Sequence, residues 1–354
     1  MAKLSIIVPT YNEVESLPFL ADRIHACLCE FDYELIIVDD NSPDGTGALA
    51  EELSQEKPIK VVHREGKLGL ASAVIDGFNH ASGDVLGVID ADLQHPPEYI
   101  PELFRAIDGA DIVIASRYVN GGGVEGWTFT REFISRGAKF APQFLFAKIR
   151  SVKDPLSGFF LFRKKAIEGI ELNPIGYKIL LEILVRGNHS EVAEVPYVFK
   201  GRERGTSTFN ATEQVNYLKH LWRLIRSEHE TRRFLRFCLV GASGVIVNQG
   251  TYWLLTRPIG INDTVAPIIG IELSILSNFV LNDIWTFRDR RQAGSIPARA
   301  LKFNLTCGAG AVLNYGVFLL LYKVFGVDDM LSYLIGIGVA MLFNYFFSKW
   351  WTWR

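Results

Sequence analysis

The chain has 354 residues, and its 37 Lys and Arg nearly balance 39 Asp and Glu, which gives a formal net charge of −2. This balance argues against a basic surface for nucleic acid, so no nucleic-acid partner is expected. The 4 cysteines form neither a Cys-x-x-Cys pair nor a cluster with histidine, which argues against a zinc site and a disulfide framework. The length suits two domains, and near Thr231 a mixed, charged sequence gives way to long apolar stretches.

The first part of the chain alternates short apolar runs with helical patterns, which is typical of an α/β domain with a mostly parallel sheet. The expected strands are Leu4–Pro9, Glu34–Val38, Lys60–Val62, Val85–Ile89 and Asp111–Ala115. The expected helices between them are Ser16–Cys29, Thr46–Glu56, Gly69–Ala81 and Pro97–Ile107. Met1-Ala2-Lys3 leads directly into the first strand without a signal peptide, so we expect this domain to stay in the cytoplasm.

Polar and charged residues follow every expected strand of this domain. They include Glu13, Asp39, Asp40, His63, Arg64, Asp90, Asp92, Ser116 and Arg117. Open parallel sheets bind ligands beyond the carboxyl ends of their strands. We therefore expect these side chains to converge on one edge of the sheet and to form the active site.

The stretch Asp90-Ala91-Asp92-Leu93-Gln94 at the end of an apolar strand predicts a metal site. Carboxylate and amide oxygens suit Mg²⁺ or Mn²⁺, and such an ion neutralises a diphosphate leaving group. We assign Asp92 and Gln94 to the metal and Asp90 to a position near the sugar or ribose. A capping or packing role is favoured for His95.

The second strand ends on Asp39-Asp40, which is followed by residues that open a helix. A carboxylate here would accept hydrogen bonds from the base or ribose hydroxyls, whereas Ser42 and Asp44 are expected only to cap the next helix. Cations for phosphate groups are expected from loops on the same edge, although each is also compatible with a solvated surface charge. These candidates are Arg64, Lys67, Arg117, Arg131, Arg202 and Arg204.

Two amphipathic helices with basic flanks are expected, one near 131–150 and one at 213–226. Such helices suit the membrane interface, and the alternative is that their apolar stripes pack on the domain core. We place the catalytic domain at 1–209, including the helix near 131–150, and an amphipathic linker at 210–229.

Residues 230–354 are expected to form a transmembrane domain of four helices. The apolar spans lie at about 234–255, 266–287, 303–325 and 331–351. Each approaches the roughly 20 residues that a bilayer requires. Arginines and lysines gather before the first span and between the second and third, so the positive-inside rule predicts that both termini are cytoplasmic.

These spans contain an ungapped internal repeat, which predicts two tandem helical hairpins. Leu235-Arg236-Phe237 corresponds to Leu301-Lys302-Phe303, and Trp285-Thr286-Phe287-Arg288 corresponds to Trp351-Thr352-Trp353-Arg354. Between them, Gly244, Asn248, Gly250 and Asn278 correspond to Gly310, Asn314, Gly316 and Asn344. The small residues and asparagines favour close helix packing, and a lipid or substrate path is the alternative.

Several motifs resemble a known family. Val8-Pro9-Thr10-Tyr11-Asn12-Glu13, Val38-Asp39-Asp40-Asn41-Ser42-Pro43-Asp44-Gly45-Thr46, Gly66-Lys67-Leu68-Gly69-Leu70 and Asp90-Ala91-Asp92-Leu93-Gln94-His95 are similar to family 2 glycosyltransferases. Ser116-Arg117-Tyr118-Val119, Arg131, Ser135-Arg136-Gly137-Ala138 and Asp154-Pro155-Leu156-Ser157-Gly158 look most like the dolichol-phosphate mannose synthases. The repeated hairpins resemble GtrA-like membrane domains. This resemblance implies a GT-A fold, which is Rossmann-like, followed by an all-α membrane domain.

The resemblance also implies roles for individual residues. Nucleotide-sugar binding is implied for Pro9, Tyr11, Glu13, Val38, Asp40, Lys67, Asp90, Ala91, Asp92 and Arg202. Acceptor-phosphate binding is implied for Arg117, Arg131 and Ser135, metal binding for Asp92 and Gln94, and catalysis for Asp90, Asp92 and Arg117.

The implied activity is transfer of mannose from GDP-mannose to dolichyl or polyprenyl phosphate at the bilayer, with inversion and with Mg²⁺ or Mn²⁺ as cofactor. One alternative is a glucosyltransferase that uses UDP-glucose and the same lipid. The other alternative is a flippase for lipid-linked sugars or a scaffold with an inactive transferase domain.

Overall fold

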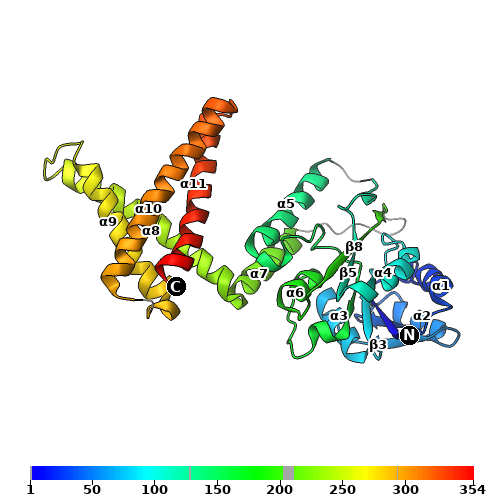
Figure 1. Ribbon diagram of the computed structural model, residues 1–354. Coiled ribbons are helices and arrows are strands. Elements are labelled where there is room, and N and C mark those ends of the chain that lie inside the picture. The colour runs from blue at the N-terminus through cyan, green and yellow to red at the C-terminus, as the bar shows by residue number, and fades with distance from the viewer. Residues whose placement is uncertain (1, 127–128, 202–210, 293) are drawn as a thin grey trace. The chain divides into compact units, whose positions relative to one another are not determined.

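The computed structural model describes residues 2–126, 129–201, 211–292 and 294–354 (Figure 1). The chain divides into two compact units, Met1–Ile225 and Arg226–Arg354. This division lies within the linker expected at 210–229.

A seven-stranded sheet with the order β3-β2-β1-β4-β7-β5-β8 forms the centre of the first unit. Its strands are β1 (Leu4–Thr10), β2 (Tyr33–Asp39), β3 (Ile59–His63), β4 (Val85–Val88), β5 (Ile112–Ser116), β7 (Phe160–Arg163) and β8 (Val192–Pro196). Two short strands, β6 (Gly123–Val124) and β9 (Val198–Phe199), pair separately. All neighbours in the large sheet are parallel except β7, which runs antiparallel to β4 and β5. The predicted mostly parallel sheet is confirmed, while β7 and β8 were not predicted.

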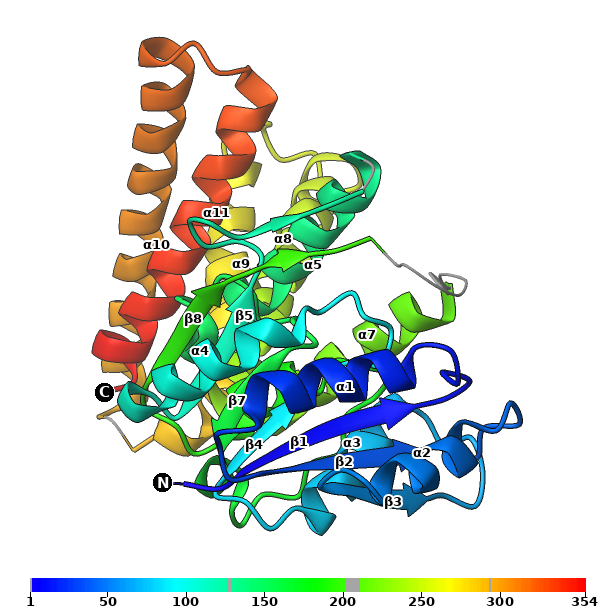
Figure 2. The same cartoon turned by 90° about the vertical axis from the view of Figure 1, so that its right-hand side faces the viewer.

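Helices cover both faces of this sheet (Figure 2). They are α1 (Leu17–Leu28), α2 (Thr46–Ser54), α3 (Leu70–His80), α4 (Ile100–Ala106) and α6 (Ile179–Arg186). Successive strand residues point to opposite faces, so Ile6 of β1 joins a buried cluster with Leu20 of α1 and Leu103 of α4. Ile7 faces α3, where a Cβ atom on Gly77 would come within 2.5 Å of it. Glycine at position 77 therefore lets α3 lie close to the sheet.

Both expected amphipathic helices are present, as α5 (Phe129–Leu145) and α7 (Ala211–Ser227). On α5, Phe140 and Phe144 are exposed and stack on each other with ring centroids 6.3 Å apart. On α7, Leu224 is buried in the first unit, whereas Trp222 is 52 % exposed. Part of the α7 stripe is thus buried, and the placement of both helices at a membrane interface stays a prediction.

The second unit consists of four long helices at the places where four spans were expected. They are α8 (His229–Thr256), α9 (Ala266–Leu281), α10 (Ile296–Leu319) and α11 (Asp329–Phe347), and π-type turns extend the last three through Thr286, Val324 and Thr352. Within the described residues, three are long and apolar enough to cross a membrane: Ala266–Thr286, Ile296–Val324 and Asp329–Thr352. The polar Asn248 and Gln249 lower the hydropathy of α8, and its crossing of the membrane stays a prediction.

The hairpin repeat is visible in the helix contacts, because α8 packs on α9 and α10 packs on α11 in the same way. The asparagine of one helix lies against a glycine of its partner in four places: Asn278 on Gly244, Asn248 on Gly270, Asn344 on Gly310, and Asn314 on Gly336. A Cβ atom on any of these glycines would come within 2.1 to 2.5 Å of the asparagine oxygen or nitrogen. These contacts support the packing interpretation of the repeated small residues.

A buried ion-pair cluster joins the two hairpins. Asp283, which follows α9, accepts hydrogen bonds from Arg299 Nε at 2.9 Å and from Trp353 Nε1 at 2.9 Å. Arg299 is only 3 % exposed, and the Trp353 ring stacks on Phe287 with centroids 4.4 Å apart. Asp283 of the first hairpin therefore neutralises Arg299, a buried cation of the second hairpin.

We expect Asp283→Ala to lower the free energy of unfolding by about 3–5 kcal/mol, because it leaves the Arg299 guanidinium buried without its counter-ion. Thermal unfolding of the purified chain in detergent measures this loss. The double variant Asp283→Ala/Arg299→Met removes both charges and is the matched control. It should recover a large part of the lost stability, and no recovery would contradict the charge-burial explanation.

Candidate functional site

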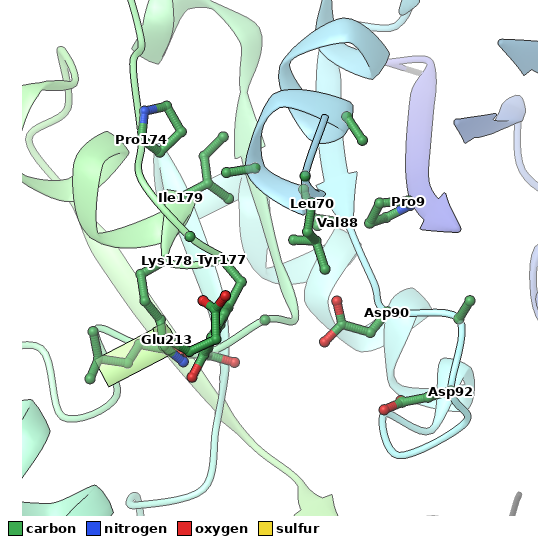
Figure 3. A pocket seen from close by; sticks show the side chains of 18 of the residues that line it. Pro9, Leu70, Val88, Asp90, Asp92, Pro174, Tyr177, Lys178, Ile179 and Glu213 are labelled. Carbon is green, nitrogen blue, oxygen red and sulfur yellow. The ribbon is translucent and has the colours of Figure 1, made fainter. Parts of the chain in front are cut away.

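A cavity of about 850 Å³ lies at the carboxyl ends of β1, β2, β4 and β5 (Figure 3). Most of the predicted site residues line it: Pro9, Tyr11, Glu13, Asp40, Lys67, Asp90, Ala91, Asp92, Gln94, Arg117 and Ser135. Val38 is not among the lining residues, because its side chain is fully buried within β2. Arg202 and the side chain of Arg131 lie outside the described residues. The prediction that the strand-end residues converge on one edge of the sheet is confirmed for Glu13, Asp40, Asp90, Asp92 and Arg117, whereas Asp39, His63, Arg64 and Ser116 do not line the cavity.

Asp40 organises the loop that precedes α3. Its carboxylate accepts hydrogen bonds from the backbone N–H groups of Leu68 at 3.0 Å and Gly69 at 2.8 Å, and it pairs with Arg64 at 2.6 Å. Lys67 of the same loop places its ammonium 3.7 Å from the centroid of the Tyr11 ring. Arg64 is therefore a counter-ion for Asp40. The sequence had suggested that it binds a phosphate group instead.

Backbone strain is concentrated where strands meet the cavity. Asn12 after β1, Asn41 after β2 and Leu93 after β4 have positive φ angles of 58°, 59° and 62°. They are the only non-glycine residues of this kind within the described ranges. Such conformations are unfavourable for residues with a Cβ atom and cluster at functional sites. Their place at three neighbouring strand ends supports the assignment of this edge as the site.

Ser42 and Asp44 form hydrogen bonds that hold the loop between β2 and α2. Ser42 bonds the Asp39 carboxylate, and Asp44 accepts from the backbone N–H of Thr46 at 3.0 Å and of Val14 at 3.2 Å. Burial alone would raise the pKa of Asp44, but these bonds lower it below its ordinary value. Asp44 thus fixes the turn that precedes α2. The N-cap of α2 is Gly45 and makes no side-chain cap bond, so the capping role predicted for Ser42 and Asp44 is wrong.

Asp90 lies at the end of β4 with its carboxylate 3.3 Å from His95 Nε2. His95 is buried, and its Nδ1 lies 3.0 Å from the Tyr197 hydroxyl, on whose ring it stacks. The packing role predicted for His95 is therefore confirmed. Because its two nitrogens face Asp90 and Tyr197, His95 also orients the Asp90 carboxylate toward the cavity.

Gly158 leaves the space in which the Asp90 carboxylate lies. A Cβ atom at position 158 would come within 2.8 Å of Asp90 Oδ2 and 3.3 Å of His95 Nε2. We expect Gly158→Ala to leave folding intact, since a side chain can rotate away, but to reduce kcat about 10²-fold by displacing Asp90. Steady-state kinetics test this. Gly109→Ala, at a position with no atom within 4 Å of the added Cβ, is the matched control. Equal kcat in both variants would show that the position of Asp90 does not matter.

Asp92 and Gln94 were predicted to hold a metal ion, and their positions fit that role. Asp92 Oδ1 accepts from the Gln94 backbone N–H at 3.1 Å, and Gln94 Nε2 donates to the Lys200 carbonyl at 3.2 Å. The Lys200 contact turns the amide nitrogen of Gln94 away from any cation. The described residues contain no cluster of three His, Cys, Asp or Glu side chains of the kind that encloses a metal. Two oxygen ligands in an open cavity suit a cation that also binds water and phosphate, as Mg²⁺ does.

Arg117 is held by a carboxylate that the sequence did not assign to it. Asp154 accepts from Arg117 Nε and Nη2, both at 2.8 Å, and from its backbone N–H at 3.1 Å. Asp154 is fully buried, and its own backbone N–H donates to Glu194 at 2.9 Å. Burial alone would lower the pKa of Arg117, but the bonds to Asp154 raise it above its ordinary value. The guanidinium is thus permanently charged and rigidly placed in the cavity wall.

Ser135 of α5 also reaches the cavity. Its hydroxyl lies 2.8 Å from the Tyr118 hydroxyl, and the Tyr118 ring lies against the Lys139 ammonium at 3.7 Å from its centroid. These contacts connect α5 with the loop that follows β5. Arg117 and Ser135, predicted to share the acceptor phosphate, therefore line one cavity from two different elements.

Lys178 is a cation of the cavity that the sequence did not reveal. It comes from the loop before α6 and lies across the cavity from Asp90 and Asp92 (Figure 3). Its ammonium is 3.3 Å from the Leu156 carbonyl and 4.1 Å from the centroid of the Tyr177 ring. Burial, and then the nearby charge of Arg117, lower the pKa of Lys178 to about 8. No motif marks this lysine, because only the folded loop brings it to the sheet edge.

Two family models match the chain, one for each unit. Residues 5–170 match glycosyl transferase family 2, and residues 236–353 match the GtrA/DPMS transmembrane domain. The match over 236–353 agrees with the long apolar helices and supports a membrane protein.

Similar proteins cover the whole chain or its first unit. A dolichol-phosphate mannosyltransferase of Pyrococcus furiosus is 49% identical over 352 residues, which are 99% of both chains. A polyprenol monophosphomannose synthase of Mycolicibacterium smegmatis is 38% identical over 58% of this chain and 81% of its own. Among solved structures, glucosyl-3-phosphoglycerate synthase from Mycobacterium tuberculosis is 21% identical, with a TM-score of 0.49 over 64% of this chain and 79% of that chain.

Proposed function

The chain belongs to the dolichol-phosphate mannosyltransferases, a family of membrane glycosyltransferases, and on this premise we propose that it transfers mannose from GDP-mannose to dolichyl or polyprenyl phosphate. The observation that carries the proposal is that one cavity is lined both by Asp90, Asp92 and Gln94 and by the cations Arg117 and Lys178. Such a cavity provides oxygen ligands for a metal–diphosphate and positive charge for a second phosphate. A sugar donor and a lipid phosphate require this combination.

The acceptor phosphate needs little activation. The second pKa of a phosphate monoester is about 6, so the group is largely dianionic near neutral pH and attacks without a general base. One of its oxygens forms a bond to the anomeric carbon of mannose. The bond from that carbon to the diphosphate breaks, and GDP leaves with the electron pair. Displacement in line inverts the α-linked donor to a β-linked product.

The task of the protein is then to position charged groups and to neutralise their charge. Arg117 and Ser135 bind the acceptor phosphate in this proposal, with Lys178 as a further cation. Asp90 lies beside the sugar, and Tyr11 and Asp40 belong to the nucleoside side of the cavity. Asp92 and Gln94 would hold Mg²⁺ or Mn²⁺, which when bound stabilises the negative charge of the diphosphate.

We further propose that the catalytic unit and both termini face the cytoplasm. Arg232 and Arg236 near the start of α8, Arg290 after α9 and Arg299 near the start of α10 lie on the same side of the four-helix topology. Excess Lys and Arg in short loops favours the cytoplasmic side.

The proposed activity is tested with the full chain purified in detergent, labelled GDP-mannose, dolichyl phosphate and Mg²⁺ or Mn²⁺. We expect label in the lipid phase that requires the metal and is lost with EDTA. Parallel reactions receive UDP-glucose in place of GDP-mannose. Labelling from UDP-glucose alone would keep the transferase but overturn mannose as the sugar. Absence of a lipid product from either donor would favour a flippase or a scaffold.

A further inference from the structure

A second cavity, of about 620 Å³, lies within the membrane unit between the start of α8 and the turn that follows α9. It is lined by His229, Arg232, Arg233, Arg236, Ile284, Trp285, Thr286, Arg288 and Asp289. Four arginines thus face a single carboxylate, and none of these residues belongs to the catalytic cavity.

The positive charge of this basic pocket is only partly neutralised. Arg233 is 3 % exposed, donates to Asp289 at 2.6 Å and also pairs with Glu230. Its Nε atom is buried and meets no acceptor within the described residues. Arg232 and Arg288 have no carboxylate within ion-pair distance among those residues. Guanidinium groups without a carboxylate partner favour the binding of a phosphate group.

The rim of the basic pocket is apolar. Ile284 and Trp285 are 47% and 43% exposed, and Arg236 donates to the Trp285 carbonyl at 3.3 Å while its guanidinium lies 5.4 Å from the centroid of the indole ring. Tryptophan and arginine together are typical of the boundary between a bilayer and water. A ligand with a phosphate and a hydrocarbon chain would satisfy both parts of the pocket, whereas a soluble anion would use only the arginines.

The second hairpin repeats the frame of this pocket with one cation fewer. Lys302 donates to the Trp351 carbonyl at 3.3 Å, as Arg236 does to that of Trp285. However, the repeat aligns Arg232 with Ala298. It also aligns His229 with Ser295 and Arg233 with Arg299, whose guanidinium is bound by Asp283. Arg236 and Arg288 align with Lys302 and Arg354, so Arg232 is the one arginine of the pocket that the repeat does not match with a cation.

We propose that the basic pocket binds the phosphate headgroup of an anionic membrane lipid. The phosphate would lie between Arg232, Arg233 and Arg288, with the lipid chain along Ile284 and Trp285. Basic pockets between membrane helices on the cytoplasmic side are known to hold such headgroups. This inference concerns the membrane unit alone and holds whichever sugar the catalytic cavity transfers.

The test measures binding of phosphatidic acid to the full chain in neutral detergent by native mass spectrometry. We expect Arg232→Gln and Arg288→Gln each to weaken binding roughly tenfold, as the loss of one charge-assisted hydrogen bond would. Both residues are partly or largely exposed and lack a carboxylate partner in the described structure, so the variants should fold. Arg257→Gln, which removes an exposed arginine from the other end of α8, is the matched control and should bind as the parent chain does.

Inorganic phosphate is added as competitor in a second series. Little displacement of the lipid is expected, because the apolar rim contributes to its affinity. Displacement by phosphate at concentrations similar to those of the lipid would overturn the lipid as ligand in favour of a soluble anion. Equal binding by Arg232→Gln, Arg288→Gln and Arg257→Gln would overturn the site itself.

Discussion

Asp92→Asn should reduce kcat for mannose transfer about 10³-fold while leaving the fold intact. Asparagine keeps the shape of the side chain and an oxygen that accepts the hydrogen bond from the Gln94 backbone N–H, now 3.1 Å from Asp92 Oδ1. What it removes is the negative charge offered to a divalent cation. Since the leaving diphosphate must be neutralised in the transition state, the loss falls on turnover more than on binding of the lipid.

Two measurements and a control variant separate this explanation from misfolding. Thermal unfolding of Asp92→Asn should match that of the parent chain, and the metal concentration for half-maximal rate should rise. Asp108→Asn, which changes an exposed aspartate away from the cavity, should affect neither quantity. Full activity of Asp92→Asn with an unchanged metal requirement would remove Asp92 from the metal site.

The strand ends were predictable because their chemistry is local. Asp40, Asp90 and Asp92 each follow an apolar run directly, so the rule that parallel sheets bind ligands at their carboxyl ends was enough to bring them together. The hairpin repeat was equally visible, because corresponding residues such as Asn248 and Asn314 recur without a gap.

Other features depend on long-range pairing that no local pattern encodes. β7 inserts antiparallel between β4 and β5, and its sequence Phe160–Arg163 does not indicate where in the sheet it pairs. In the same way, Arg117 was predicted as a phosphate ligand, but its partner Asp154 lies 37 residues further along. Val38, for which the resemblance implied a nucleotide contact, does not line the cavity. Both faces of β2 are covered, so its side chain is buried.

Lys178→Met should lower kcat/KM for the lipid phosphate roughly 10²-fold, because it removes a cation from the wall that faces Asp90. The parent chain should also lose kcat/KM as the pH rises through about 8. Burial lowers the pKa of Lys178 to about 8, so the protonated form that binds phosphate disappears above that pH. KM for GDP-mannose should change less than KM for the acceptor.

Two further variants, Lys178→Arg and Lys219→Met, test whether the charge of Lys178 itself causes these effects. Lys178→Arg keeps the charge at all accessible pH values, since guanidinium groups stay protonated. Its kcat/KM should therefore remain level where that of the parent chain falls. Lys219→Met, on the exposed face of α7, should retain the parent profile. If kcat/KM of Lys178→Arg still falls near pH 8, the titration belongs to another group. If Lys219→Met and Lys178→Met lose the same acceptor affinity, overall charge rather than the cavity cation controls binding.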